Sequence, residues 1–209
     1  MKTLLSLATL ILFSIPAKAT VIYLDSDAAS TTNNSGYATM DLSGTLHPNP
    51  GWGTALAGSE WISYGSTGDH GDPGYFSPAN GTLVIFTTTF LLSGSITAAS
   101  LTVMADDYAS VVLNGQTLTT AHSTLGSPCS NASMGCEPST EGVFSFSSLS
   151  PYLVDGANTL SFGVLEVNGS SFGLDFAGSV TDTTATPEPA TPAFIGGGLV
   201  ALGALRRRR

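Results

Sequence analysis

The sequence predicts an all-β protein, a jelly-roll β-sandwich of about eight antiparallel strands, flanked by a signal peptide and a C-terminal hydrophobic helix. Three observations lead to this fold. Apolar and polar residues alternate along several short segments, as in strands with one buried face. Turn-forming residues separate these segments, and 24 of the 209 residues are Gly. Between residues 20 and 186 no stretch of useful length has the 3.6-residue period of a helix.

The first half of the body contains three expected strands, at residues 20–24, 61–64 and 81–92. The third is a continuous run of apolar residues and threonines, which is typical of a central strand buried on both faces. A fourth strand places Leu101, Val103 and Ala105 on one side and leads into a pair of aspartates.

A hairpin follows, because Asn114-Gly115 is a residue pair that two-residue turns favour. Its strands are residues 109–114, with Val111 and Leu113 inward, and residues 116–118. Another strand is indicated by Phe144 and Phe146, which alternate with serines.

Two more strands complete the expected sandwich, at residues 158–167 and 171–180. The first faces the core with Leu160, Phe162 and Val164. The second faces the core with Phe172, Leu174, Phe176 and Val180. Asp175 falls on the opposite face of that strand, where we expect solvent.

The basic residues lie only at the two ends of the chain: Lys2, Lys18, Arg206, Arg207, Arg208 and Arg209. The body between residues 20 and 186 has no Lys or Arg, and it holds all of the fifteen Asp and Glu residues except Glu188. Such a body cannot neutralise phosphates, which excludes nucleic acids and disfavours phosphorylated ligands and anionic lipids. Metal cations and neutral polymers remain as partners.

Residues 1–19 have the organisation of a signal peptide. Lys2 precedes an apolar run at residues 4–15, and Ala17-Lys18-Ala19 supplies the small residues that signal peptidase recognises. The alternative is an uncleaved anchor, but the run is shorter than the roughly 20 residues that span a bilayer. We therefore expect cleavage after Ala19 and export.

Residues 183–209 form a C-terminal tail with three parts in a fixed order. Pro187, Glu188 and Pro189 come first, residues 190–205 are apolar, and Arg206 to Arg209 end the chain. This order resembles the PEP-CTERM sorting signal of Gram-negative bacteria. The resemblance implies a transient inner-membrane anchor, cleavage by an exosortase, and delivery to the cell surface or the extracellular matrix. Only the terminal segments would then contact the membrane.

The two cysteines, Cys129 and Cys136, lie in a stretch rich in Ser, Gly and Asn. In an exported chain we expect two cysteines to form a disulfide. A redox or metal-binding role is the alternative, although the spacing is not C-x-x-C.

The body of the protein is assigned to residues 20–182. Three blocks of residues within it resemble a second known family. The blocks are residues 48–52 with 60–63, residues 105–107 with 112–115, and residues 153–160 with 173–176. In this order they resemble the galactose-binding-like jelly rolls that often precede PEP-CTERM tails. The resemblance implies a carbohydrate-binding ancestry but identifies no ligand.

Asp106 and Asp107 are the leading candidates for a metal site, because adjacent carboxylates at a strand end offer hard oxygen ligands for Ca²⁺. The alternative is that they cap a bend through backbone amides. Asp25 and Asp27, which follow the first strand, are secondary calcium ligands by analogy with sugar-binding jelly rolls.

Flat aromatic rings beside turns are candidates for stacking on a sugar ring, and Trp52, Tyr75 and Tyr108 meet this description. For Trp52 a second possibility stays open, that it plugs one end of the sandwich. Trp61 begins a strand and is expected in the core.

Catalysis is not expected. Glu166 and Asp175 lie on expected strands and are a conceivable acid and base of a glycosidase. No nucleophile elbow is present, and His47, His70 and His122 all lie in expected loops. The predicted function is that of an exported, non-catalytic protein that binds extracellular polysaccharide, with a possible requirement for calcium. The alternatives are a structural matrix protein for adhesion or biofilm cohesion, and a secreted glycoside hydrolase.

Overall fold

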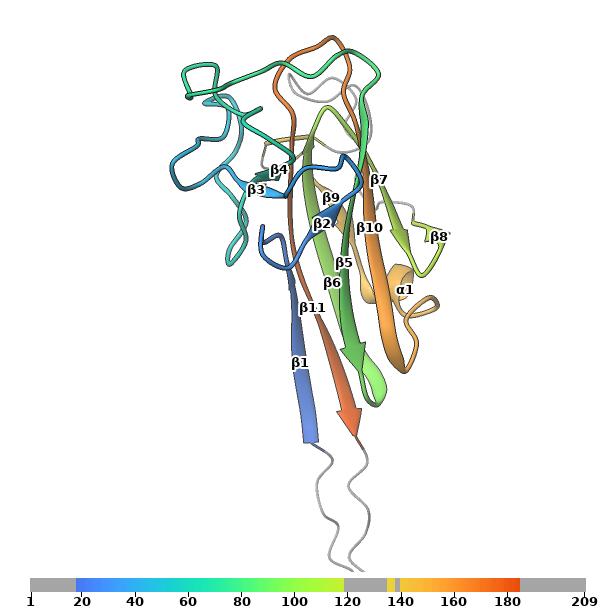
Figure 1. Ribbon diagram of the computed structural model, residues 1–209. Coiled ribbons are helices and arrows are strands. Elements are labelled where there is room, and N and C mark those ends of the chain that lie inside the picture. Colours follow the sequence, from blue (N-terminus) through green and yellow to red (C-terminus); the bar gives the residue numbers. More distant parts are fainter. Residues whose placement is uncertain (1–17, 119–134, 138–139, 185–209) are drawn as a thin grey trace, which may run out of the picture. The chain divides into compact units, whose positions relative to one another are not determined.

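The computed structural model describes residues 18–118, 135–137 and 140–184, and it confirms an all-β fold (Figure 1). Its elements are β1 Lys18–Asp25, β2 Thr32–Asn33, β3 Met40–Asp41, β4 Ile62–Ser63, β5 Leu83–Leu92, β6 Ser95–Asp106, β7 Tyr108–Leu113, β8 Gln116–Thr117, β9 Gly142–Phe144, α1 Phe146–Leu149, β10 Gly156–Leu165 and β11 Gly173–Thr184. This part of the chain thus has eleven strands rather than about eight, and the two that the sequence did not predict, β2 and β3, are pairings of two residues each. One compact unit spans Ala19–Thr183.

The strands form two antiparallel sheets. The six-stranded sheet has the order β3-β4-β11-β6-β9, with β1 also paired to β11. The five-stranded sheet has the order β2-β5-β10-β7-β8. From β5 to β7, and again from β9 to β11, each step along the chain passes from one sheet to the other (Figure 1).

The inward faces of both sheets build one core, as the alternation predicts. Leu160, Phe162 and Val164 of β10 are buried, as are the inward residues of β11. Phe162 stacks on Phe176 from the other sheet, with ring centroids 4.3 Å apart. Each such apolar side chain contributes about 1.5–3 kcal/mol when it is fully buried.

The predicted hairpin is confirmed. Leu113 pairs with Gln116, and Asn114 and Gly115 both have positive φ, as a type I′ turn requires. The strand predicted through Phe144 and Phe146 ends earlier than expected. Phe146 begins α1 instead, since the backbone N–H of Ser145 donates to the Ser148 hydroxyl at 3.0 Å and starts a helical turn.

The prediction that β5 is buried on both faces is wrong. Val84 and Phe86 point into the core, but Leu83 is 55% exposed and Leu91 is 72% exposed. The five-stranded sheet has a core on one side only, so every second residue of β5 faces outward.

A second, smaller apolar cluster covers part of the outward face of the six-stranded sheet. Its members are Leu42, Leu46, Trp52, Trp61, Met104 and Cys136. Met104 alternates with the core residues of β6 and so points away from the main core. Trp61 is buried as predicted, and its Nε1–H donates to the carbonyl of Gly53 at 3.0 Å. The segment between β3 and β4 therefore closes this face.

Several predictions concern residues outside the described part of the chain. These are the signal peptide before Lys18, the sorting residues Pro187 to Pro189 and Arg206 to Arg209, and Cys129. Cys136 is buried in the second cluster, and its pairing with Cys129 stays a prediction. None of the helices in the described residues is both long enough and apolar enough to cross a membrane.

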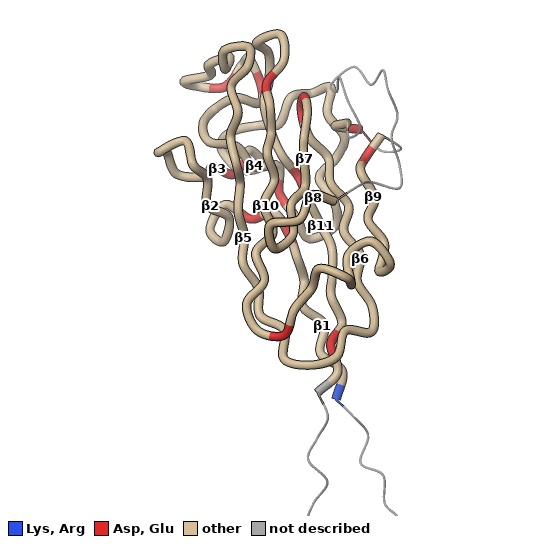
Figure 2. Tube along the Cα trace, turned by 90° about the vertical axis from the view of Figure 1, so that its right-hand side faces the viewer, with Lys and Arg blue, Asp and Glu red and all other residues tan. Residues whose placement is uncertain are grey.

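Acidic residues are spread over the described chain, and Lys18 at the start of β1 is its one basic residue (Figure 2). The structure therefore offers no Lys or Arg within Ala19–Thr183 to balance a buried carboxylate, and among the described residues His47 is the side chain that pairs with one, since its Nδ1 lies 2.6 Å from Oδ1 of the buried Asp72. Buried carboxyl groups of this body must be stabilised by hydrogen bonds or by protons.

Candidate functional site

An aromatic pocket lies between the segment that joins β2 to β3 and the loop that follows β4. Its volume is about 510 Å³, and its lining residues are Tyr37, Ala38, Met40, Tyr64, Gly65 and Phe76. Tyr37 is 71% exposed and Phe76 is partly exposed, so the rings are open to solvent. The pocket has no charged lining residue. These are properties of a surface that accepts an uncharged, partly apolar ligand.

The floor of the aromatic pocket is rigidly attached to the core. Tyr64 packs edge-on against Phe76, with centroids 5.6 Å apart, and against the buried Phe172 at 5.4 Å. Gly65 permits this arrangement, because a Cβ at this position would lie 2.6 Å from Cε1 of Phe76. Burial raises the pKa of Tyr64 above its ordinary value, so its hydroxyl stays protonated at neutral pH.

None of the three aromatic residues predicted from the sequence lines this pocket. Trp52 is only 8% exposed, so the prediction of an open stacking platform is wrong. Its indole lies against Trp61, with centroids 4.4 Å apart, and its Nε1–H donates to Oδ2 of Asp106 at 2.7 Å. The alternative of a Trp that plugs the fold agrees with this burial.

The other two predicted aromatics occupy different places. Tyr75 is half-buried and packs edge-on against His70, with centroids 4.4 Å apart. Tyr108 begins β7 and is 41% exposed on the outward face of the five-stranded sheet. The sequence signal for Tyr64 and Phe76 was present but weak, since both adjoin turn-forming residues just as Tyr75 does.

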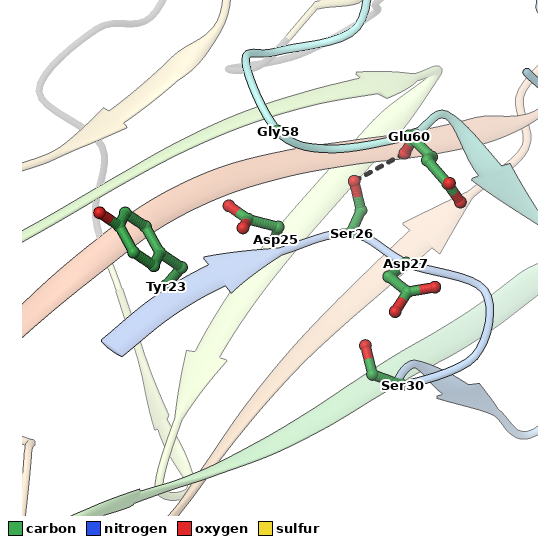
Figure 3. Close-up of a pocket in the computed structure, with 7 residues that line it drawn as sticks. All are labelled: Tyr23, Asp25, Ser26, Asp27, Ser30, Gly58 and Glu60. Carbon is green, nitrogen blue, oxygen red and sulfur yellow. Dashed lines mark hydrogen bonds between the residues drawn. The ribbon is translucent and has the colours of Figure 1, made fainter. Parts of the chain in front are cut away.

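A second, acidic pocket of about 290 Å³ lies at the end of β1 (Figure 3). It is lined by Tyr23, Asp25, Ser26, Asp27, Ser30, Gly58 and Glu60. Partial burial raises the pKa values of Asp25 and Glu60, and the charges of Asp41 and Asp27 add to the shift of Glu60. Asp27 also stabilises the turn that follows, because its Oδ1 accepts the backbone N–H of Ala29 at 2.8 Å.

Three buried carboxyl groups meet where β6 and β10 end: those of Asp106, Asp107 and Glu166. The Asp107 carboxyl adjoins the carboxyls of both Asp106 and Glu166, and its interaction with them helps to raise the pKa of each. Oδ1 of Asp106 and Oε2 of Glu166 accept no hydrogen bond from any donor in the described residues. We call these three residues the carboxyl cluster.

The carboxyl cluster also ties neighbouring segments together. Oδ2 of Asp107 accepts the backbone N–H of Val167 at 2.7 Å, and Oε1 of Glu166 accepts that of Ser170 at 2.8 Å. Burial, followed by the charge of Asp107, raises the pKa of Asp106 to about 9. Burial also raises the pKa of Glu166 to about 7. Both groups therefore hold protons in the folded state well above the pH at which they would lose them in the unfolded chain.

This cluster predicts that the protein is more stable in mild acid than in mild base. A carboxyl whose pKa is raised on folding stabilises the fold fully below its unfolded pKa, and this stabilisation is lost as pH rises through the folded value. The melting temperature should therefore fall between about pH 5 and pH 9. The variant Asp106→Asn should show a smaller fall, since the amide resembles a protonated carboxyl. Thermal melts over this pH range test it, and a wild-type melting temperature that rises with pH contradicts it.

Among the described residues, no group of three or more His, Cys, Asp or Glu side chains is arranged to hold a metal ion. The calcium sites predicted at Asp106 with Asp107, and at Asp25 with Asp27, thus remain predictions. The structure brings Asp25 and Asp27 to one pocket, and it brings Asp106 and Asp107 together with Glu166.

Asp175 is the clearest error of the sequence interpretation, because it is fully buried rather than solvated. Its side chain does leave the outward face of β11, but the segment before β4 covers it. Oδ1 accepts the hydroxyls of Ser26 at 2.9 Å and Ser59 at 2.5 Å, and Oδ2 accepts the backbone N–H of Leu56 at 2.8 Å. Burial raises the pKa of Asp175, and these hydrogen bonds oppose the shift.

No protein-family model matches the chain, and no curated protein matches it. Among solved structures, the chain is similar to a family 35 carbohydrate-binding module from Clostridium thermocellum, with a TM-score of 0.37 and 11% identity over 76% of this chain and 97% of the module.

Two enzymes show weaker similarity. One is a β-porphyranase of glycoside hydrolase family 86 from the human gut bacterium Bacteroides plebeius, with a TM-score of 0.31 and 19% identity over 53% of this chain. The other is an exo-β-1,3-galactanase from Phanerochaete chrysosporium, with a TM-score of 0.31 and 12% identity over 78% of this chain. The chain spans only 19% and 29% of these enzymes, so neither similarity extends to a whole enzyme.

Proposed function

We propose that this protein is an exported, non-catalytic module that binds neutral polysaccharide in the aromatic pocket. The observation that carries the proposal is the set of three aromatic rings, Tyr37, Tyr64 and Phe76, around an open, uncharged pocket of about 510 Å³. The C–H faces of a sugar ring stack on such rings, and the Tyr hydroxyls can exchange hydrogen bonds with sugar hydroxyls. In this proposal the sandwich is a galactose-binding-like jelly roll.

The charge of the body supports a neutral ligand over an acidic one. Residues 20–186 have no Lys or Arg and fourteen carboxylates, so uronic acids and sulfated sugars would be repelled. A neutral polymer meets no such repulsion.

Burial supports a binding role rather than a catalytic one. Glu166 and Asp175, the conceivable acid and base, are both fully buried and bonded to other protein groups. A general acid must reach the glycosidic oxygen. Neither carboxyl lines either of the two pockets described above.

Export and sorting form the other half of the proposal and rest on the terminal segments. Signal peptidase would remove residues 1–19, and an exosortase would act at the tail that contains Pro187 to Pro189. The protein would then reach the cell surface or the matrix of a Gram-negative bacterium, with its membrane contact limited to the terminal segments.

Removing one ring from the pocket should weaken binding without unfolding the protein. We expect Tyr37→Ala to lower the affinity for neutral polysaccharide about tenfold, since aromatic anchors dominate such contacts. Its melting temperature should stay nearly unchanged, because Tyr37 is mostly exposed. The matched control is Tyr152→Ala, which removes another exposed Tyr that does not line the pocket. Affinity gels with β-glucan, galactomannan and acidic alginate, run with calcium and then with chelator, provide the measurement.

The same gels separate the remaining functions. Equal mobility with every polymer contradicts the proposal and favours a structural matrix protein. Retardation that disappears with chelator supports a calcium requirement, and its loss in Asp106→Asn would assign the ion to the carboxyl cluster. Release of new reducing ends from any polymer favours a glycoside hydrolase.

A further inference from the structure

The outward face of the five-stranded sheet is open, and the residues that point outward from β5, β10 and β7 include no charged side chain. The strand register arranges these side chains in rows that cross the sheet. One row consists of Leu83, Leu165 and Tyr108, and the next consists of Ile85, Gly163 and Ser110. Leu83, Ile85 and Tyr108 are among the exposed large apolar residues of the described chain.

The second row is low at its centre, because Gly163 has no side chain. A Cβ at this position would lie 2.8 Å from Oγ of Ser110. The row beyond it consists of Thr87, Ser161 and Val112, and the hydroxyls of Thr87 and Ser161 lie 3.1 Å apart. The row of Ile85 is therefore bordered by apolar side chains on one side and by hydroxyl groups on the other. Sugars present the same combination, apolar C–H faces and hydroxyl edges.

One end of this row is hydrogen-bonded to the segment that leads into the aromatic pocket. Asn34 is bonded to Ile85 twice: its backbone N–H donates to the Ile85 carbonyl at 3.2 Å, and its Oδ1 accepts the Ile85 N–H at 2.8 Å. Tyr37, three residues further on, lines the pocket. The segment that carries one wall of the pocket is thus held against the end of the row.

We propose that a neutral polysaccharide chain held in the aromatic pocket continues across the outward face of the five-stranded sheet, along the row of Ile85, Gly163 and Ser110 and toward Tyr108. This inference rests on the proposed function and makes its ligand an extended polymer rather than a single sugar. Three strand spacings separate β2 from β7, a path of roughly 15 Å.

The charge of the molecule favours this occupant over a second copy of the chain. Each body carries fourteen carboxylates and no Lys or Arg, so two bodies repel each other as they approach. A neutral polymer meets an uncharged face without that cost, and its hydroxyls find partners in Thr87 and Ser161.

A ladder of oligosaccharides of increasing length, cut from galactomannan and from β-glucan, tests the path by titration calorimetry on the full chain. Wild-type affinity should rise with length beyond the pocket. In Ser110→Glu and in Tyr108→Ala the longest oligomer should lose about tenfold in affinity, while the shortest binds as in wild type. The matched control, Ser100→Glu, places the same charge on the outward face of the six-stranded sheet, and its affinity should rise with oligomer length as in the wild type.

The outcomes distinguish this inference from the proposed function. If Tyr37→Ala loses binding but Ser110→Glu keeps the gain with length, the pocket stands and the path along the sheet is wrong. An equal loss in Ser110→Glu and Ser100→Glu overturns the path as well, since a general charge effect explains it. If no oligomer binds to the wild type, both proposals fall. A wild-type dimer that Ser110→Glu converts to a monomer assigns the face to self-association and overturns the inference.

Discussion

Replacing Asp175 with alanine is expected to lower the free energy of unfolding by about 2–4 kcal/mol, through one unpaired buried N–H and the loss of the hydrogen bonds to the carboxylate. The carboxylate accepts hydrogen bonds from Ser26, Ser59 and the backbone N–H of Leu56, and it is fully buried. Alanine leaves the backbone N–H of Leu56 without an acceptor, at a cost of about 1–3 kcal/mol, whereas the hydroxyls of Ser26 and Ser59 can still donate to the carbonyls of Glu60 at 2.6 Å and Leu56 at 2.9 Å. A small domain has only about 5–15 kcal/mol of stability, so the variant should be close to unfolding.

Denaturant unfolding of the full chain provides the measurement, with Ser179→Ala as the matched control. Ser179 lies on the same strand and face but is only partly buried, so its loss should cost less than about 0.5 kcal/mol. The loss of stability in Asp175→Asn should lie between the losses in Asp175→Ala and Ser179→Ala, since the amide keeps one acceptor oxygen but turns an N–H donor toward the serines. Equal stability of Asp175→Ala and the wild type would show that these contacts do not hold the covering segment.

The strands and their inward faces were accessible to sequence reasoning because they depend on local alternation. A half-buried strand is predicted by the alternation of Leu160, Phe162 and Val164 with their neighbours, and this prediction does not depend on which segment packs against the strand. Asn114-Gly115 likewise fixes its hairpin through backbone conformation alone. The error over β5 has the same origin, since apolar residues occupy both faces of this strand although only one face meets the core.

The site residues could not be predicted from local alternation, because their positions depend on the way in which the long connections between strands fold back over the sheets. The segment between β3 and β4 covers Asp175 and removes Trp52 from solvent. The connection after β10 brings Glu166 to the two aspartates. Tyr37 and Phe76 are far apart in sequence, and no periodic signal relates them. Such contacts are set by tertiary packing, which a single sequence does not specify.

Gly173 illustrates this dependence on tertiary packing, and Gly173→Ala is expected to cost about 3 kcal/mol of stability. Its backbone does not have positive φ, so alanine meets no conformational barrier there. The new Cβ would instead lie 2.5 Å from Cη2 of Trp52 and 3.4 Å from Cε3 of Trp61. Both rings are buried and in contact, so neither can move without opening the second apolar cluster.

Gly163→Ala is the matched control, since it adds the same methyl group to a mid-strand glycine of the other sheet. Its Cβ would lie 2.8 Å from Oγ of Ser110, a hydroxyl that can rotate away, and at ordinary contact distance, 3.8 Å, from Cδ1 of Leu83, so stability should change by less than about 1 kcal/mol. Displacing Trp52 should also break its hydrogen bond to Asp106 and shift the Trp fluorescence to longer wavelength. Denaturant melts followed by fluorescence report both effects. Equal stability of Gly173→Ala and Gly163→Ala would contradict this prediction, because it would mean that the Trp52 ring is free to move. The hydrogen bond from Trp52 Nε1–H to Asp106 would then not fix the position of the carboxyl cluster.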